Sequence, residues 1–189
     1  MSADSIDEPL ARRVRPGDWD RLADFSCSAG AWYEDEVERF VRTRLRGHVE
    51  RRAPHLETSI VILADADDPE EIVAIGAHEL DDQQTEDGRH VEGTYLIVGA
   101  VRRDLQGMAV NIELFADGRA VTLGRLLAET MIDDLPQRSG LVRAVMTREN
   151  VRSLKLCDRV GLTHEQPDSD ERFVQRLGRL AGRSGARCR

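Results

Sequence analysis

The order of the predicted elements indicates a single α/β domain. An extended stretch and two helices come first, three apolar strands follow in a row, and the second half alternates strand and helix. A chain of 189 residues is long enough for one hydrophobic core and too short for two ordinary ones. We expect about seven strands and about four helices in one domain spanning residues 1–189, with residues 10–178 ordered and a basic tail at 179–189.

Sequence patterns place the elements of the first half. The extended stretch Ala11–Arg15 is stopped by Pro16 and Gly17, and Asp18 is a candidate N-cap for a helix to about Ser26. A longer helix, roughly Tyr33–Arg52, shows apolar residues at three- and four-residue steps. The strands that follow are expected at Thr58–Ala64, Glu71–Leu80 and Gly93–Val101. The last is almost wholly apolar, which is typical of a strand covered on both faces.

The second half continues the alternation of helix and strand. A helix is expected at Arg119–Asp134, a strand at Leu141–Met146 and a helix at Asn150–Val160. Residues 162–166 and 172–177 form a closing hairpin on either side of the polar segment QPDSD.

Charge and composition exclude several classes of protein. The formal net charge is −8 and the pI is about 5.2, which disfavours a general nucleic-acid binder. Residues 64–93 hold eleven acids against one arginine, so a cationic partner would be attracted there. The arginine-rich face Arg39–Arg52 of the long helix could supply a basic groove, so a charged tRNA is not excluded as a partner. No apolar run is long enough to cross a membrane and no secretory signal is visible, so we expect a cytoplasmic protein.

Cysteines and histidines give no metal or disulfide pattern. Cys27, Cys157 and Cys188 are too few and too scattered for a disulfide framework or a zinc site. His78 and His90 lack the paired spacing of metal ligands, so no metal is expected.

Two segments carry most of the functional information, and the first has a pattern that suits a phosphate-bearing ligand. Glycine before a helix lets a phosphate approach backbone N–H groups at the positive end of the helix dipole. The chain offers Gly107 within Gln106–Ala109 and Gly118 within Asp117–Ala120. The second segment is Asn150–Leu162, a helix with a capping asparagine and a terminal glycine that directly follows a strand.

Together these segments resemble the GNAT superfamily of acetyl-CoA-dependent N-acetyltransferases. The family motif N-x-x-(A/S)-x-x-(L/F)-Y-x-x-x-G-F is matched by Asn150, Ser153, Leu156, Gly161 and Leu162. The element order matches over roughly residues 10–178. The resemblance implies an α/β fold with a mixed, mostly antiparallel sheet of about seven strands flanked by about four helices.

The resemblance also implies a site for acetyl-CoA. The family loop reads R/Q-x-x-G-x-G/A, whereas Asp104 or Phe115 stands at its leading position here. We favour the loop at Gly118, with Leu105–Phe115 as an insertion, and keep Gly107 as the alternative. The implied cofactor-binding residues are Gly99, Ala100, Val101, Gly118, Arg119, Ala120, Val121, Thr122, Asn150 and Ser153.

The implied activity is transfer of an acetyl group to a primary amine of a small molecule or protein by direct attack. A general base is then needed, and Glu79 is preferred over Asp81 and Asp104. Cys157 stands where many members carry a proton-donating tyrosine, so it is either a proton donor or a packing residue. A catalytically silent acyl-CoA-binding or regulatory protein is the alternative, and a homodimer is left open.

Overall fold

The computed structural model describes residues 5–51, 58–84, 90–111, 121–136 and 140–179. Its strands are β1 (Ser5–Asp7), β2 (Leu10–Arg13), β3 (Thr58–Ala64), β4 (Ile72–Gln84), β5 (His90–Val101), β6 (Ala109–Asn111), β7 (Val121–Thr122), β8 (Leu141–Thr147), β9 (His164–Pro167) and β10 (Phe173–Gly178). Its helices are α1 (Asp18–Ala23), α2 (Trp32–Arg39), α3 (Leu45–Arg51), α4 (Leu123–Asp133) and α5 (Val151–Val160), with the π-helical segment η1 (Phe40–Arg44) and the 3-10 turn η2 (Arg103–Leu105).

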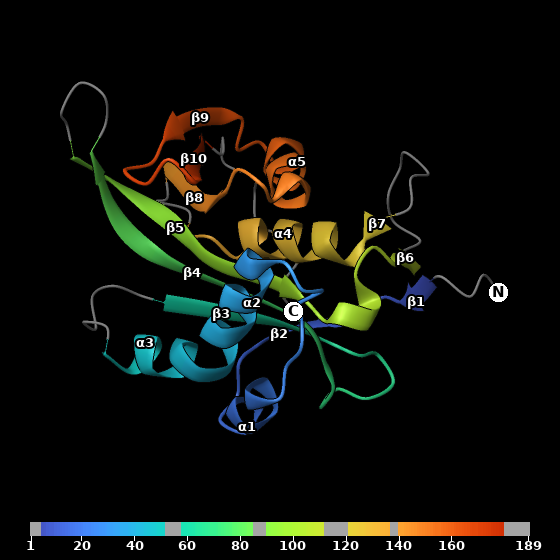
Figure 1. The fold of residues 1–189 in the computed structure, drawn as a ribbon. Coiled ribbons are helices and arrows are strands. Elements are labelled where there is room, and N and C mark those ends of the chain that lie inside the picture. The colour runs from blue at the N-terminus through green and yellow to red at the C-terminus, as the bar shows by residue number, and fades with distance from the viewer. Residues whose placement is uncertain (1–4, 52–57, 85–89, 112–120, 137–139, 180–189) are drawn as a thin grey trace.

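A seven-stranded sheet forms the centre of the molecule (Figure 1). Its strand order is β2-β3-β4-β5-β8-β10-β9, and every neighbouring pair is antiparallel except β5 and β8. α2, η1 and α3 continue as one helix, so the predicted long helix and the mixed, mostly antiparallel sheet are both confirmed.

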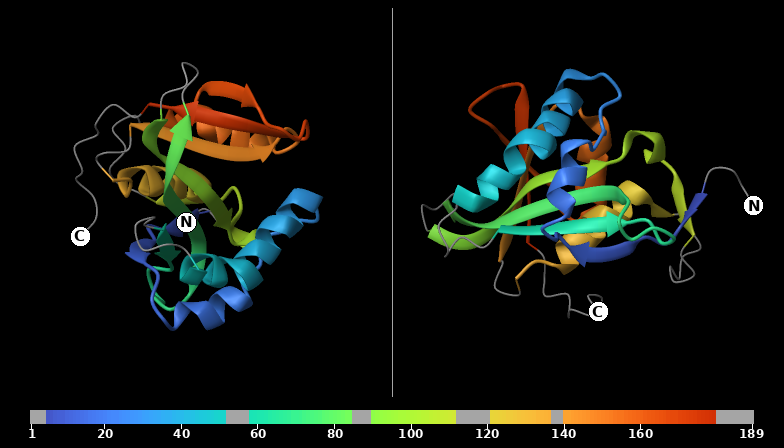
Figure 2. Two further views of the ribbon diagram at one scale, coloured as in Figure 1. Left: turned by 90° about the vertical axis from the view of Figure 1, so that its left-hand side faces the viewer. Right: turned by 90° about the horizontal axis from the view of Figure 1, so that it is seen from below.

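Helices cover both faces of this sheet (Figure 2). On one face, Leu22 of α1, Val41 of η1 and Leu45 of α3 pack against apolar residues of β3, β4 and β5. On the other face, α4 packs over β3 and β4, and α5 packs with α4 against β8. Within the described part of the chain, no helix combines the length and the apolar character needed to cross a membrane.

Two local predictions are corrected by the structure. Gly17, not Asp18, is the N-cap of α1. The Asp18 carboxylate instead accepts hydrogen bonds from the Arg12 guanidinium at 2.7 and 2.8 Å and from the Arg15 backbone at 2.6 Å. The helix expected from Arg119 begins at Leu123, because Val121 and Thr122 pair as a strand with β6.

A second, three-stranded sheet was not predicted. β6 lies between β1, which is parallel to it, and β7, which is antiparallel. Ile6 and Val110 are register partners, and both pack into the hydrophobic cluster around α4. Ser5–Asp7 are therefore attached next to the start of α4, more than a hundred positions away in the sequence.

Candidate functional site

The central strands β5 and β8 separate part-way along their length. Their parallel register joins Gly93–Leu96 to Leu141–Ala144 and ends there. At this point Ile97 is an extra residue in β5, since His78 pairs with Leu96 and Ala77 with Val98. A bulge bends its strand, which explains why β5 turns away from β8. We call the separated parts, Ile97–Val101 of β5 and Val145–Thr147 of β8, the strand fork (Figure 1).

The fork leaves backbone groups of β5 facing the side of β8. The N–H of Arg102 donates to the carbonyl of Val73 in β4 at 2.9 Å. Because backbone groups alternate in direction along a strand, Ala100 faces β4 as well, and Gly99 and Val101 face the fork. Gly99 is exposed, whereas Ala100 is 6% exposed and packs in the core. Of the three predicted residues, two therefore present their backbone groups to the fork and Ala100 does not.

One of the two candidate glycine loops lies against the start of α4. Met108, next to Gly107, accepts a hydrogen bond from the Leu123 N–H at 3.3 Å. Gly107 has φ +82°, and a Cβ there would meet no atom within 4 Å. The favoured residues Gly118, Arg119 and Ala120 lie outside the described residues.

Val121 and Thr122, the last residues of the favoured loop, have partners in the protein. Their backbones pair with Val110 and Ala109 in the small sheet. The Thr122 hydroxyl also accepts from the Arg125 N–H at 3.4 Å, which makes Thr122 the N-cap of α4. Among the described residues, the turn at Gly107 is therefore the loop that the structure brings to the tip of α4.

The predicted capping of α5 is confirmed at both ends. Asn150 is the N-cap and its side-chain oxygen accepts from the Ser153 N–H at 3.0 Å. Gly161 ends the helix in the left-handed conformation with φ +93°. Arg152, on the first turn, lies 3.5 Å from the side-chain oxygen of Gln106. Asn150 and the Gly107 turn thus lie at the same, open end of the fork.

The sequence of the chain matches no family model and no curated protein sequence. It is similar in structure to the GNAT domain of S. lividans PAT, with a TM-score of 0.57 and 14% identity over 90% of this chain and 89% of that one. It is also similar to the ribosomal-protein-alanine N-acetyltransferase from Brucella melitensis, with a TM-score of 0.52 and 15% identity over 90% and 99% of the two chains.

A third similar structure contains a ligand. It is a mutant AtaT toxin bound to the C-terminus of the antitoxin AtaR and to acetyl-CoA, with a TM-score of 0.55 and 15% identity over 89% of this chain and 92% of that one. The chain has the GNAT fold. Identities this low show the fold alone.

In this GNAT fold, Glu79 is the most buried of the three predicted base candidates. It lies on β4 as the register partner of Tyr95, one residue before the end of the β5–β8 pairing. Its side chain is 4% exposed, and one carboxylate oxygen lies 3.0 Å from Nε2 of His48 on α3. The rivals are ion-paired with arginines, Asp81 with Arg143 at 2.6 Å and Asp104 with Arg102 at 2.7 Å.

Cys157 lies in the hydrophobic cluster between α4, α5 and β8. It is 7% exposed, its Sγ lies 3.8 Å from Sδ of Met146, and burial raises the pKa of its thiol to about 11. These surroundings favour packing over proton donation, which the sequence left as two alternatives.

We expect the Cys157→Ala variant to keep acetyl-CoA affinity and turnover within about twofold of the wild type, because only a packing atom is lost. Its free energy of unfolding should fall by about 1 kcal/mol, as for a small buried truncation. Urea unfolding and steady-state kinetics measure the two quantities. A tenfold fall in turnover at unchanged affinity would instead identify the thiol as the proton donor.

Two polar residues of β8 beside the fork, Arg143 and Thr147, could not be identified from the sequence. On β8, Val142, Ala144 and Met146 face the α4–α5 side, so Arg143 and Thr147 face the α2 side. Tyr95 is the register partner of Arg143, and the guanidinium carbon of Arg143 lies 4.8 Å from the centre of the Tyr95 ring. Burial raises the pKa of the Tyr95 hydroxyl. The Thr147 hydroxyl is buried with no hydrogen-bond partner among the described residues. Neither position can be recognised until the strand register is known.

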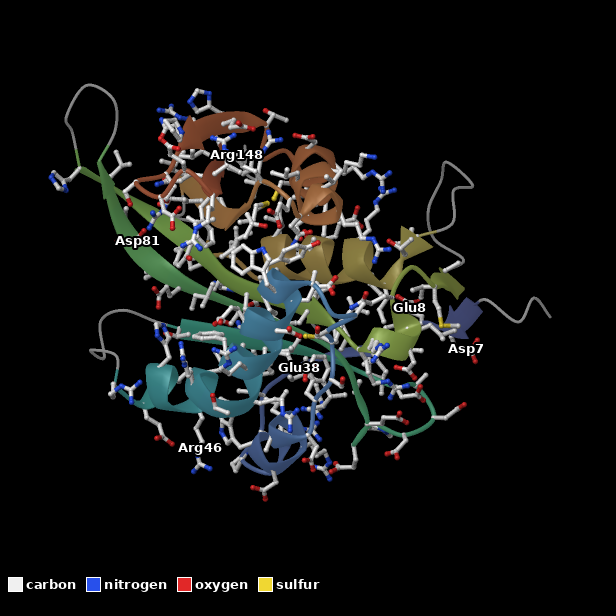
Figure 3. All side chains as sticks on the ribbon, in the orientation of Figure 1. Asp7, Glu8, Glu38, Arg46, Asp81 and Arg148 are labelled. Atoms are coloured by element: carbon white, nitrogen blue, oxygen red, sulfur yellow. The ribbon has the colours of Figure 1, made fainter. Side chains whose placement is uncertain are left out.

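Trp32 joins the start of α2 to the loop that follows β8. Its indole N–H donates to the Glu149 carboxylate at 2.9 Å. Glu149 directly precedes Asn150, so this bond ties the start of α2 to the loop between β8 and α5. Figure 3 labels Glu38, which lies on the same helix as Trp32, and Arg148, which directly follows β8.

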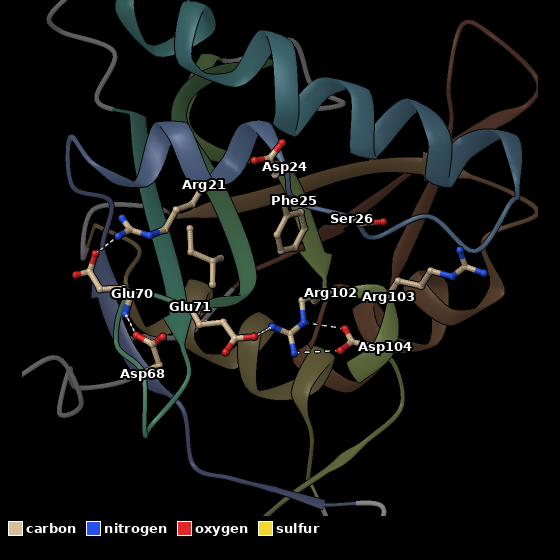
Figure 4. A pocket seen from close by; sticks show the side chains of 11 residues that line it. Arg21, Asp24, Phe25, Ser26, Asp68, Glu70, Glu71, Arg102, Arg103 and Asp104 are labelled. Carbon is tan, nitrogen blue, oxygen red and sulfur yellow. Dashed lines mark hydrogen bonds and ion pairs between the residues drawn. The ribbon is translucent and has the colours of Figure 1, made fainter.

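A broad surface groove lies between α1, the connection from β3 to β4 and the residues that directly follow β5 (Figure 4). Most charged side chains in it are paired with each other. Arg21 pairs with Glu70, and Arg102 pairs with both Glu71 and Asp104. These pairs satisfy the charges within the protein, so we place the candidate chemistry at the fork.

Proposed function

We propose that the chain transfers an acetyl group from acetyl-CoA to a primary amine. The observation that supports this most strongly is the strand fork, with exposed Gly99 on β5 and the Asn150-capped helix directly after β8. An arm that carries amide groups, such as the pantetheine of acetyl-CoA, could pair with the fork-facing backbone of Gly99 and Val101 as an added strand does.

We further propose that the diphosphate lies at the turn Gln106–Ala109. The first amides of α4 offer less than the sequence implied, because the N–H groups of Leu123 and Arg125 have protein acceptors at 3.3 and 3.4 Å. The open space at Gly107 and the nearby Arg152 cation suit an anion at this turn.

Within this proposal Glu79 removes the proton of the acceptor. The amine nitrogen forms a bond to the thioester carbonyl carbon, the carbon–sulfur bond breaks, and the sulfur leaves with the electron pair as a thiolate that then takes up a proton. His48, 31% exposed, lies between Glu79 and solvent-facing parts of α3 and can pass the proton on.

The Glu79→Gln variant is expected to lower kcat about hundredfold, because the amide cannot accept the proton and general base catalysis contributes about 10²–10⁴-fold. Its acetyl-CoA Kd should remain within about twofold of the wild type. Kinetics with a saturating amine and calorimetry measure the two effects. Asp104→Asn is the control, since Asp104 was a rival base. An equal loss in that variant, or none in Glu79→Gln, would remove Glu79 from this role.

A silent acyl-CoA-binding protein remains the second proposal. The core position of Cys157 and the protein acceptors of the α4 amides favour it. Calorimetry with acetyl-CoA, followed by thiol-release assays over a panel of amines, separates the two. Binding without release of thiol on every amine supports the silent protein. No binding of acetyl-CoA contradicts both.

We propose a small amine or a protein amine as the acceptor, in preference to charged tRNA. On the long helix, Arg39, Arg42 and Arg46 are each ion-paired with a glutamate of the same helix. These pairs neutralise much of the positive charge that a nucleic-acid backbone would require.

A further inference from the structure

Two aromatic rings form a partly exposed surface at the open end of the fork, on its α2 side. Trp32 at the start of α2 and Phe173 at the start of β10 have ring centres 6.2 Å apart and planes at 88°. Trp32 is 40% exposed although it is large and apolar. Phe173 is the register partner of Thr147, the last residue of β8. We call Trp32 and Phe173 the aromatic seat.

The chain's own arginine already occupies this seat. The guanidinium carbon of Arg172 lies 5.7 Å from the centre of each ring, within the range of a cation–π contact. The Arg172 side chain is 68% exposed, and Asp170 holds it at 2.6 Å. A cation therefore fits over these rings, and the present one can move into solvent.

A buried hydroxyl lies on the same side of the fork. Thr147 is 5% exposed, and its Oγ1 has no hydrogen-bond partner among the residues that the structure describes. An unpaired buried hydroxyl costs free energy, so such groups in proteins commonly serve a ligand or an ordered water. This observation is independent of the aromatic seat and points to a polar ligand at the same place.

The local charge favours a cationic ligand. If the Arg172 side chain swings away, the Asp170 carboxylate loses its charged partner and keeps the hydrogen bond from the Arg172 backbone N–H at 3.0 Å. The Glu149 carboxylate is held against the Trp32 indole. An incoming cation would thus replace an internal one, and the balance of charge at the seat would be preserved.

We propose that the aromatic seat binds a second cationic group of the acceptor, in exchange for Arg172, while Thr147 hydrogen-bonds the acceptor chain. The acceptor is then a diamine or an amine that carries a guanidinium. This inference rests on the proposed transfer to an amine, but the binding it describes needs no acetyl-CoA.

Calorimetry with two probes tests the proposal. Agmatine carries an amine at one end and a guanidinium at the other, whereas butylamine lacks the second cation. In the Arg172→Ala variant agmatine should bind more tightly, with a Kd about fivefold lower than that of the wild type, because the competing internal cation is removed. The Kd of butylamine should change by less than about twofold. Arg159→Ala, an equal charge change at an exposed site on α5, is the control and should leave both constants within about twofold.

Two further variants test the other parts of the seat. Trp32→Leu should weaken agmatine binding about fivefold or more and affect butylamine less. Thr147→Val should weaken both probes, because the acceptor chain is common to them, while its Tm should not fall. Circular dichroism confirms that each variant is folded.

These measurements distinguish failure of the aromatic seat from failure of the proposed acetyl transfer. Unchanged or weaker agmatine binding in Arg172→Ala, or no binding to either wild type or variant, overturns the seat. If the binding pattern appears but no amine is acetylated, the seat stands and the transferase fails. If amines are acetylated and Arg172→Ala has no selective effect, the transferase stands and the seat fails.

Discussion

Replacing Gly107 with valine is expected to weaken acetyl-CoA binding about tenfold to hundredfold. The branched side chain would fill the open space at the turn beside α4, and hydrogen bonds to a charged ligand are worth about 1.5–3 kcal/mol each. Valine also resists the φ of +82° that this residue adopts. Calorimetry with acetyl-CoA gives the change in Kd.

Gly30→Val is the matched control for this variant. Gly30 also has a positive φ, +107°, and a Cβ there would also meet no atom within 4 Å, so the backbone strain is similar. It lies before α2 and should leave acetyl-CoA affinity within about twofold. If Gly118→Val abolishes binding and Gly107→Val does not, the diphosphate lies at the loop that the sequence favoured.

Replacing Asp134 with alanine is expected to lower the free energy of unfolding by about 3–5 kcal/mol. Asp134 follows α4 and its side chain is 5% exposed. Its carboxylate lies 2.8 Å from Nε2 of His78 and 2.6 Å from the Arg13 guanidinium, and it accepts from the Ser59 hydroxyl at 2.8 Å. Truncation leaves the buried His78 and the half-buried Ser59 without this partner, and urea unfolding measures the cost.

Asp133→Ala is the control, because Asp133 is the exposed neighbour on the same helix. It should change the free energy of unfolding by less than about 0.5 kcal/mol. A similar loss in both variants would mean that helix charge, and not the buried cluster, accounts for the effect.

The same carboxylate gives an expected pH dependence. Burial acts to raise the pKa of Asp134, but hydrogen bonds from His78 and Ser59 and the charge of Arg13 outweigh it, so the pKa is lowered. A lowered pKa in the folded state adds stability above the unfolded value of about 3.9, and this is lost as the pH falls through the folded value. The stability difference between wild type and Asp134→Asn should therefore shrink as the pH falls below about 4. A difference that grows on acidification contradicts this assignment.

The sequence predicts elements whose signals are local. The Asn150 cap, the Gly161 stop and the apolar spacing of the long helix are each contained within a few residues. The order of these elements also sufficed to indicate the strand content and helix content of the GNAT fold.

Features that depend on register could not be predicted in this way. The direction of the Ala100 backbone follows from the extra residue Ile97, which one strand's sequence does not reveal. The position of Asp18 before the first helix favours an N-cap, but its carboxylate binds the Arg12 guanidinium instead. The face of Thr147 is set by its pairing with Phe173 across two strands. In each case a contact between distant segments decides the outcome.

The pairing of β1 with β6 has a practical consequence for work on this protein. Ser5–Asp7 form one border of the small sheet that leads into α4. An affinity tag fused before these residues therefore alters the surroundings of the proposed diphosphate turn. Ligand titrations made with such a fusion therefore need to be repeated after the fusion has been removed, before an affinity for the cofactor is assigned.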